Sequence, residues 1–248
     1  MVNKDNPKKG KKAELMIKNS LPNQQQIINV LKKKLKIKGE LEGISRPADY
    51  HDKVDVTIFF DSGRQIDANI KSTSQLSFNG HLHRTSIAKF CKHFHLSENY
   101  VSDLERIILE KAKDSEKELF AEKDWKRWGA FFEKNAKELL KLAFSENPSR
   151  EILVLVYIKK TSLVKIYAMK DVLRELSKQL SKQKIKRTKG GCDLGKNVSF
   201  QRKGGDGNVK TYPKTDIRHP SNEIQFKLKI GKDKDFLNNI ELAKYNIQ

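Results

Sequence analysis

Two runs of strand-forming residues with a short polar turn between them predict a β-hairpin over residues 53–72. Successive side chains of a strand point to opposite faces of a sheet. The second run therefore presents three polar side chains on one face: Asp67, Asn69 and Lys71. If the two runs pair, Asp55 of the first run converges on the same place.

These side chains form a pattern with chemical meaning. Carboxylate and amide oxygens suit a hard divalent cation, and an ammonium group beside them suits a phosphate. This combination is typical of metal-dependent phosphodiester hydrolysis. The pattern has a simpler alternative, since an Asp and a Lys on neighbouring strands often form only a surface salt bridge.

The charge of the chain indicates the class of partner. Its 248 residues include 51 Lys and Arg against 31 Asp and Glu, which gives a formal net charge of +20. A polyanion is the expected partner, with nucleic acid first and an anionic membrane surface as the rival. The sequence contains no apolar run long enough to cross a bilayer. Cys91 and Cys192 are too few for a disulfide framework and lack a zinc-binding spacing, which fits a reducing cytoplasm.

The order of expected elements predicts an α/β fold with a central mixed β-sheet flanked by helices. We expect one domain over residues 1–248, in which residues 1–12 fray and residues 84–145 form a helical region. The apolar run at 152–159 predicts a buried central strand, and residues 163–168 a partner strand. The other expected elements are helices at 13–19, 23–37 and 171–183, loops at 39–52 and 184–196, and an antiparallel strand pair at 198–203 and 223–230. Four aromatic residues at helical spacing are expected to pack in the core: Trp125, Trp128, Phe131 and Phe132.

A second stretch, residues 198–206, combines a strand with a basic, glycine-containing end. Arg202 and Lys203 end the strand, and Gly204 and Gly205 permit a close approach of the backbone to a ligand. Such a ribbon end suits the surface of DNA, although it is also compatible with a solvated turn.

With these motifs in view, the chain resembles a known family. Residues 201–206, followed by residues 224–227, resemble the C-terminal end of the HinP-type restriction endonucleases. Residues 55–58 and the Asn-x-Lys triplet at 69–71 resemble the active-site hairpin of the MspI type. Both types belong to one group within the PD-(D/E)xK nuclease superfamily. The superfamily has Asp or Glu where this chain has Asn69, but the group has Asn or Gln there, so the departure favours the closer match.

The resemblance implies a restriction-endonuclease-like core, a magnesium cofactor (Mg²⁺) and roles for individual residues. Asp55, Asn69 and Lys71 would be catalytic, and the metal ligands would be Asp55, Asn69 and the Ile70 carbonyl. Asp67 and Glu14 are further helpers for a second metal, although Asp67 is equally compatible with a paired surface acid. The implied DNA-binding residues lie in two stretches: Phe78, Asn79, Gln201, Arg202, Lys203, Gly204, Gly205 and Asp206. Phe78 would act as a wedge between base steps, with an ordinary core position as the alternative.

The expected function is that of a type II restriction endonuclease that cuts double-stranded DNA at a short GC-rich palindrome. Residues 184–230 would form its DNA-recognition region, and it would act as a monomer or weak homodimer. A cognate methyltransferase would protect host DNA without needing to bind this chain. The alternatives are a structure-specific DNA repair nuclease and a catalytically inactive DNA-binding protein.

Overall fold

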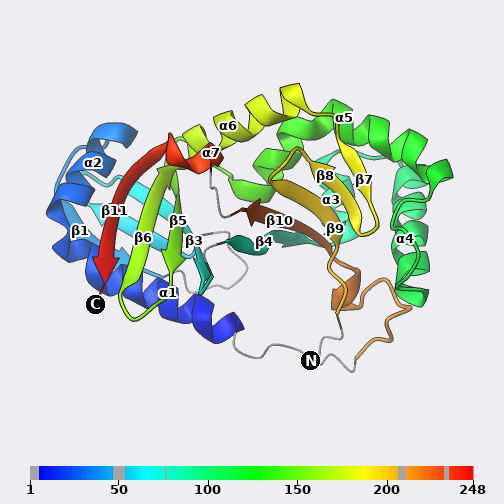
Figure 1. The fold of residues 1–248 in the computed structure, drawn as a ribbon, viewed down its shortest axis with the longest axis horizontal. Helices are drawn as coiled ribbons and strands as arrows, with labels where there is room; N and C mark the ends of the chain where they lie inside the picture. The colour runs from blue at the N-terminus through cyan, green and yellow to red at the C-terminus, as the bar shows by residue number, and fades with distance from the viewer. Residues whose placement is uncertain (1–5, 47–53, 76, 206–210, 232–234, 248) are drawn as a thin grey trace.

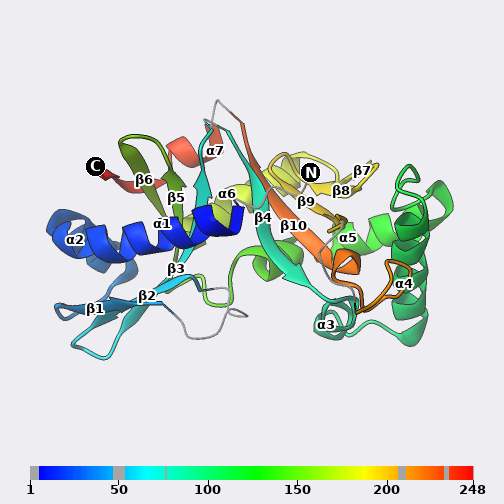
Figure 2. The same ribbon diagram turned by 90° about the horizontal axis from the view of Figure 1, so that it is seen from below.

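A computed structural model describes residues 6–46, 54–75, 77–205, 211–231 and 235–247. Two β-sheets dominate it, and they lie towards opposite ends of an elongated molecule (Figure 1). Seen from below, helices α3 and α4 lie at the end of the molecule that carries the second sheet (Figure 2).

The first sheet contains the expected hairpin. Its strand order is β1-β2-β3-β5-β6-β11. In chain order, these strands are Leu41–Ser45, Val56–Phe60, Gln65–Thr73, Glu151–Tyr157, Ser162–Ala168 and Glu241–Ile247. The β3–β5 pair is parallel and the other pairs are antiparallel, so the prediction of a mixed sheet is confirmed.

Each face of the first sheet packs against its own apolar cluster. Ile66, Ala68 and Ile70 of β3 join one cluster with helices α1 (Asn6–Ser20) and α2 (Gln25–Leu35). Alternate residues of β5, such as Leu153, belong to the cluster on the opposite face. All seven residues of β5 are buried, as expected of a central strand between two covered faces.

The second sheet is antiparallel throughout, with strand order β4-β10-β9-β8-β7. Its strands in chain order are Phe78–Thr85 (β4), Lys186–Thr188 (β7), Gly191–Leu194 (β8), Val198–Arg202 (β9) and Ile224–Ile230 (β10). Its apolar side chains pack in one cluster with helices α3 (Ile87–His93), α4 (Glu98–Lys113), α5 (Glu122–Phe144) and α6 (Met169–Lys182). Three short helical segments complete the chain: η1 (Leu21–Asn23), η2 (Pro220–Asn222) and α7 (Asp235–Asn238).

An aromatic cluster fills this second core. Trp128 and Phe132 of α5 are fully buried, and Phe132 packs 4.9 Å, ring centre to ring centre, from Phe200 of β9. Phe131 is 8% exposed. The prediction of core packing for these side chains is therefore confirmed.

The structure corrects several expected elements. The loop expected at 39–52 contains β1, and the loop expected at 184–196 contains the β7–β8 hairpin. Strands β4 and β11 were not expected, and α1 begins at Asn6 rather than at Ala13. These strands are short or rich in polar residues, so their local sequence carries a weak strand signal, and pairing with distant partners stabilises them.

Candidate active site and nucleic-acid interface

The β2–β3 hairpin brings Asp55 to the polar face of β3. Val56 pairs with Ala68 in antiparallel register, and the backbone N–H of Asp55 donates to the Ala68 carbonyl over 2.9 Å. Asp55 therefore lies beside the Ala68–Ile70 stretch of β3. The Asp55 carboxylate accepts a 2.6 Å hydrogen bond from the Ile70 backbone N–H, which ties the carboxylate to β3.

Lys71 completes a compact group of polar atoms. Its Nζ lies 3.7 Å from Oδ2 of Asp55, and the Lys71 and Asp55 side chains are 14% and 27% exposed. An ammonium and a carboxylate are thus held together at a half-buried position. The ion pair by itself is also what a structural salt bridge would form.

The buried amide of Asn69 distinguishes this group from an ordinary salt bridge. Asn69 is 5% exposed, and in the described part of the chain its Oδ1 atom has no hydrogen-bond partner. Its partner across the parallel β3–β5 pair is Leu153, which offers no side-chain donor. A buried acceptor without a donor costs about 1–3 kcal/mol, so a cation bound at Oδ1 would satisfy an otherwise unpaired group.

The donor set at this hairpin fits Mg²⁺, which accepts carboxylate, amide and carbonyl oxygens. The N–H and C=O groups of a strand residue point to the same side, so the Ile70 carbonyl faces the side of β3 on which Asp55 lies. No three His, Cys, Asp or Glu side chains form a metal-binding group within the described ranges. A cation here would therefore need the Asn69 amide and backbone oxygens in addition to Asp55.

The two helper acids have other partners. Asp67 accepts hydrogen bonds of 3.1 Å from the Thr57 hydroxyl and from the Gln65 side-chain amide. Glu14 forms an ion pair with Arg46. Asp67 shares the strand face of Asn69, but it is buried and accepts from neutral donors, so it differs from the paired surface acid that the sequence left open as the alternative.

The second candidate region is the polar face of the five-stranded sheet. Gln201 of β9 and Gln225 of β10 are paired across the strands, and Nε2 of Gln201 donates to Oε1 of Gln225 over 3.3 Å. Their neighbours Phe200 and Phe226 point to the core on the other face. Because side chains alternate, Lys227 lies on the same face as Gln225.

Lys227 is not among the DNA-binding residues that the sequence predicted. Burial, with Lys229 and Arg84 nearby, lowers the pKa of Lys227. This side chain thus lies in a region of positive potential. The alternation of apolar and polar residues in 224–230 was the signal that could have identified it.

Arg202 is held by residues that follow the adjoining loop. Its Nε and Nη2 groups donate to Oδ1 of Asn222 over 2.9 and 2.8 Å, and Nη2 also donates to the Ser221 hydroxyl over 3.1 Å. Asn222 in turn donates to the backbone carbonyls of Lys214 and Asp216. Burial lowers the pKa of the Arg202 guanidinium, which stays charged at neutral pH. Among the residues that the structure describes, Nη1 of Arg202 has no hydrogen-bond partner, so it is the group left for an external acceptor.

The residues after Arg202 run alongside the segment that precedes β10, and the Lys203 N–H donates to the Glu223 carbonyl over 2.8 Å. Lys203 lies 3.5 Å from the Glu223 carboxylate. Gly204 and Gly205 have φ values of +65° and +79°, a left-handed conformation that glycine adopts without strain. Gly204 donates its N–H to the Ser221 carbonyl over 2.9 Å. Asp206, the last residue of the motif, lies outside the described residues.

Phe78 and Asn79 begin strand β4, opposite Ile230 and Lys229 of β10. Phe78 is 5% exposed and belongs to the core, and its ring packs so closely on Gly80 that an added Cβ there would lie 2.4 Å from it. Phe78 is therefore a core residue in this structure. To act as a wedge between DNA base steps, its ring would have to move out of the core.

No family model matches the chain, and no curated protein sequence matches it. Among solved structures, it is similar to the restriction endonuclease MspI in complex with its cognate DNA, with a TM-score of 0.52 and 16% sequence identity. The match covers 88% of this chain and 83% of MspI. In the described residues, no helix is long and apolar enough to cross a membrane. The chain therefore has the α/β fold of a restriction endonuclease, with a mixed sheet flanked by helices.

Proposed function

We propose that this protein is a Mg²⁺-dependent endonuclease that hydrolyses phosphodiester bonds in double-stranded DNA. The observation that carries the proposal is the convergence of Asp55, the unpaired Asn69 amide and Lys71 on one hairpin. The similarity of the whole fold to an endonuclease solved with its cognate DNA supports it.

In this proposal, Asp55, Asn69 and the Ile70 carbonyl hold the metal ion. Mg²⁺ bound there would polarise the scissile phosphate and stabilise the leaving oxygen, which contributes several kcal/mol. Lys71 would orient the attacking water and screen the charge of the phosphate. The Ile70 N–H holds the Asp55 carboxylate in place through its 2.6 Å hydrogen bond, so the site is formed before DNA binds.

DNA recognition is assigned to the second sheet. The net charge of +20 favours contacts with phosphates, which give affinity and register. Gln201 and Gln225 share one polar face with Lys227. The amide groups would read base edges in the major groove, and Lys227 would contact a phosphate. Lys203, Gly204 and Gly205 follow at the end of β9, whereas Arg202, opposite Ile224, lies on the other side of the strand from Gln201.

The finer assignment is a type II restriction endonuclease in the cytoplasm, specific for a short GC-rich palindrome and acting as a monomer or weak homodimer. Its cognate methyltransferase would protect host DNA without binding this chain. The remaining metal helpers, Asp67 and Glu14, and the DNA contacts of Phe78, Asn79 and Asp206 stay part of this proposal.

Incubation of the purified protein with plasmid DNA and Mg²⁺ tests the proposal. Discrete fragments are expected, and sequencing of the cleaved ends would identify the recognition site. Nicking that depends on DNA structure rather than sequence would indicate a repair nuclease. A gel shift without cleavage at any Mg²⁺ or Mn²⁺ concentration would indicate a DNA-binding protein without catalytic activity and would contradict the proposal.

A further inference from the structure

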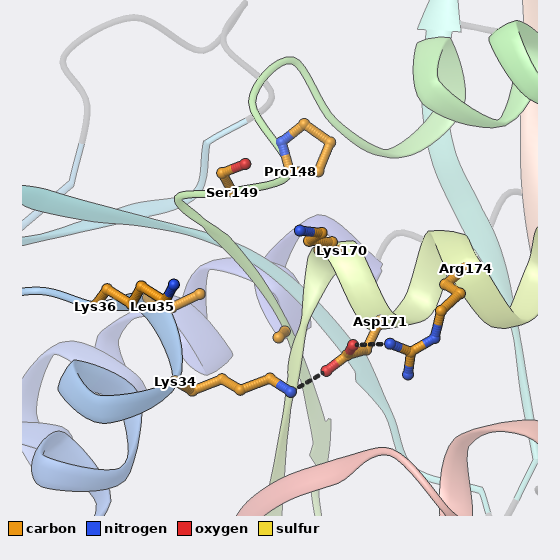
Figure 3. A pocket seen from close by; sticks show the side chains of 9 residues that line it. Lys34, Leu35, Lys36, Pro148, Ser149, Lys170, Asp171 and Arg174 are labelled. Carbon is orange, nitrogen blue, oxygen red and sulfur yellow. Dashed lines mark ion pairs between the residues drawn. The ribbon is translucent and has the colours of Figure 1, made fainter.

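A cavity of about 410 Å³ lies outside the two regions described above. Its volume falls within the range of about 300–1,000 Å³ that is common for small-molecule sites. It is lined by the end of α2, the residues before β5 and the start of α6 (Figure 3). Its lining residues are Lys34, Leu35, Lys36, Pro148, Ser149, Ala168, Lys170, Asp171 and Arg174.

The cavity adjoins the start of β3, where the Asp67 N–H donates to the Arg150 carbonyl, but Asp55, Asn69 and Lys71 do not line it. Ser149 and Pro148 precede Glu151, the first residue of β5, whereas Lys71 lies opposite Leu155 on the same strand. Four residues of a strand span roughly 13 Å. A ligand in this cavity would therefore not be the phosphate that Asp55 and Lys71 face.

The charge of the lining is strongly positive. Four cationic side chains face one carboxylate, which leaves a formal charge of +3. Asp171 is 9% exposed and pairs with Lys34 over 2.7 Å and with Arg174 over 2.9 Å. Figure 3 shows these two cations reaching Asp171 from different elements. Within the described ranges, Lys36 and Lys170 form no ion pair.

Asp171 thus holds two cations in place without neutralising the cavity. Lys34 is 43% exposed and Arg174 55% exposed, so each keeps N–H groups available to a ligand. Lys36 and Lys170 supply two further ammonium groups, and Ser149 a hydroxyl. Concentrated N–H donors and positive charge in a concave site suit a phosphate group, with its charge of up to −2 and its acceptor oxygens.

We propose that this cavity is an accessory phosphate-binding site. The phosphate would come either from a small phosphomonoester or from a DNA backbone outside the cleavage site. Lys36 and Lys170 would provide most of the affinity, because binding would give each an anionic partner that it lacks within the described ranges.

The test compares two double variants that lose the same charge from the same two helical regions. Lys36→Asn with Lys170→Gln removes the cavity ammoniums, and Asn tolerates the left-handed φ of +54° at position 36. The matched control, Lys33→Gln with Lys182→Gln, changes exposed lysines of α2 and α6 that do not line the cavity. Each protein is titrated with inorganic phosphate, with a nucleoside 5′-monophosphate and with a short duplex, at constant ionic strength.

The wild type and the control variant should bind the probe equally well. A dissociation constant about tenfold or more higher for the cavity variant would support the site, since a charged hydrogen bond contributes about that factor. If the phosphomonoesters show this loss, the ligand is a small phosphate; if only the duplex shows it, the ligand is the DNA backbone. Equal behaviour of the two double variants towards all three probes would overturn the proposal.

Asp171→Asn provides a test of the opposite sign. Removal of the carboxylate frees Lys34 and takes a negative charge from the cavity, while Arg174 keeps its 3.4 Å contact with Glu175, so phosphate should bind more tightly than to wild type. Phosphate affinity that is unchanged or weaker in this variant, with an unchanged melting temperature, would show that the Asp171 charge does not oppose the ligand and would contradict the proposal. Cleavage at the hairpin is not a readout in either test, so the result is independent of the proposed nuclease activity.

Discussion

The Nζ atom of Lys71 lies 3.7 Å from Oδ2 of Asp55, and the same oxygen accepts a hydrogen bond from the backbone of Ile70. A carboxylate that is already fixed by the backbone of the neighbouring strand loses little conformational freedom on binding a cation. The arrangement therefore resembles a prepared ligand more closely than a mobile surface ion pair.

Asp55→Asn should abolish cleavage and preserve DNA binding. The substituted amide oxygen can still accept from the Ile70 N–H, so the hairpin is retained while the charge that holds Mg²⁺ is lost. We expect cleavage to fall by about 10³-fold or more, since metal stabilisation contributes several kcal/mol. Plasmid cleavage in Mg²⁺ and binding titrations in Ca²⁺ measure the two effects. Glu42→Ala, at an exposed acid on β1, is the control, and normal cleavage by Asp55→Asn would refute the site.

Substitutions at Asn69 should separate stability from activity. Asn69→Leu removes the unpaired buried acceptor, so the free energy of unfolding should equal the wild-type value or exceed it by about 1–3 kcal/mol. Cleavage should nevertheless be largely lost. Urea unfolding and plasmid assays on the same preparation give both quantities. If Asn69→Leu lowers stability and cuts normally, Asn69 has a packing role.

Asn69→Asp should make the stability of the protein depend more strongly on Mg²⁺. A second buried carboxylate destabilises the protein without a cation and provides a stronger ligand with one. The melting temperature should therefore rise more on addition of Mg²⁺ than it does for wild type. An identical rise in both proteins would argue against a ligand at position 69.

Arg202→Ala should reduce discrimination between DNA sequences. Its Nε and Nη2 groups are engaged by Asn222 and Ser221, so Nη1 would contact the DNA, and the loss on the cognate site should be near the lower end of about 1–3 kcal/mol. Lys186→Ala, at an exposed residue of β7, should weaken cognate and scrambled duplexes alike. Titrations with both duplexes in Ca²⁺ make the comparison, and an equal loss on the two duplexes with Arg202→Ala would identify a backbone clamp.

Lys227→Met should stabilise the free protein and weaken DNA binding. Burial and neighbouring cations lower the pKa of Lys227, so its charged form is disfavoured in the fold and removing it relieves that cost. If the side chain contacts a phosphate, the slope of log affinity against log salt should fall by about one. An unchanged slope in Lys227→Met would place Lys227 away from the phosphates.

The DNA affinity of the wild-type protein should fall by roughly 10³-fold or more between about 50 and 200 mM salt, if about six or more phosphates are contacted.

The local sequence was enough to predict the hairpin and the face that carries Asp67, Asn69 and Lys71, because the alternation of side chains is a property of the strand itself. The buried strand at Glu151–Tyr157 was predictable for a similar reason: seven residues that are apolar apart from Glu151 indicate two covered faces.

Only the tertiary structure decided which distant residues complete each site. Strand β4 has a polar sequence and forms by pairing with β10, and Arg202 is positioned by Asn222, which lies beyond a long loop. Within the described ranges, Oδ1 of Asn69 likewise lacks a donor because a parallel strand places Leu153 beside it. Periodicity describes the surroundings of a residue along its own strand, whereas hydrogen-bond partners and burial depend on chain segments that meet only when the two sheets assemble.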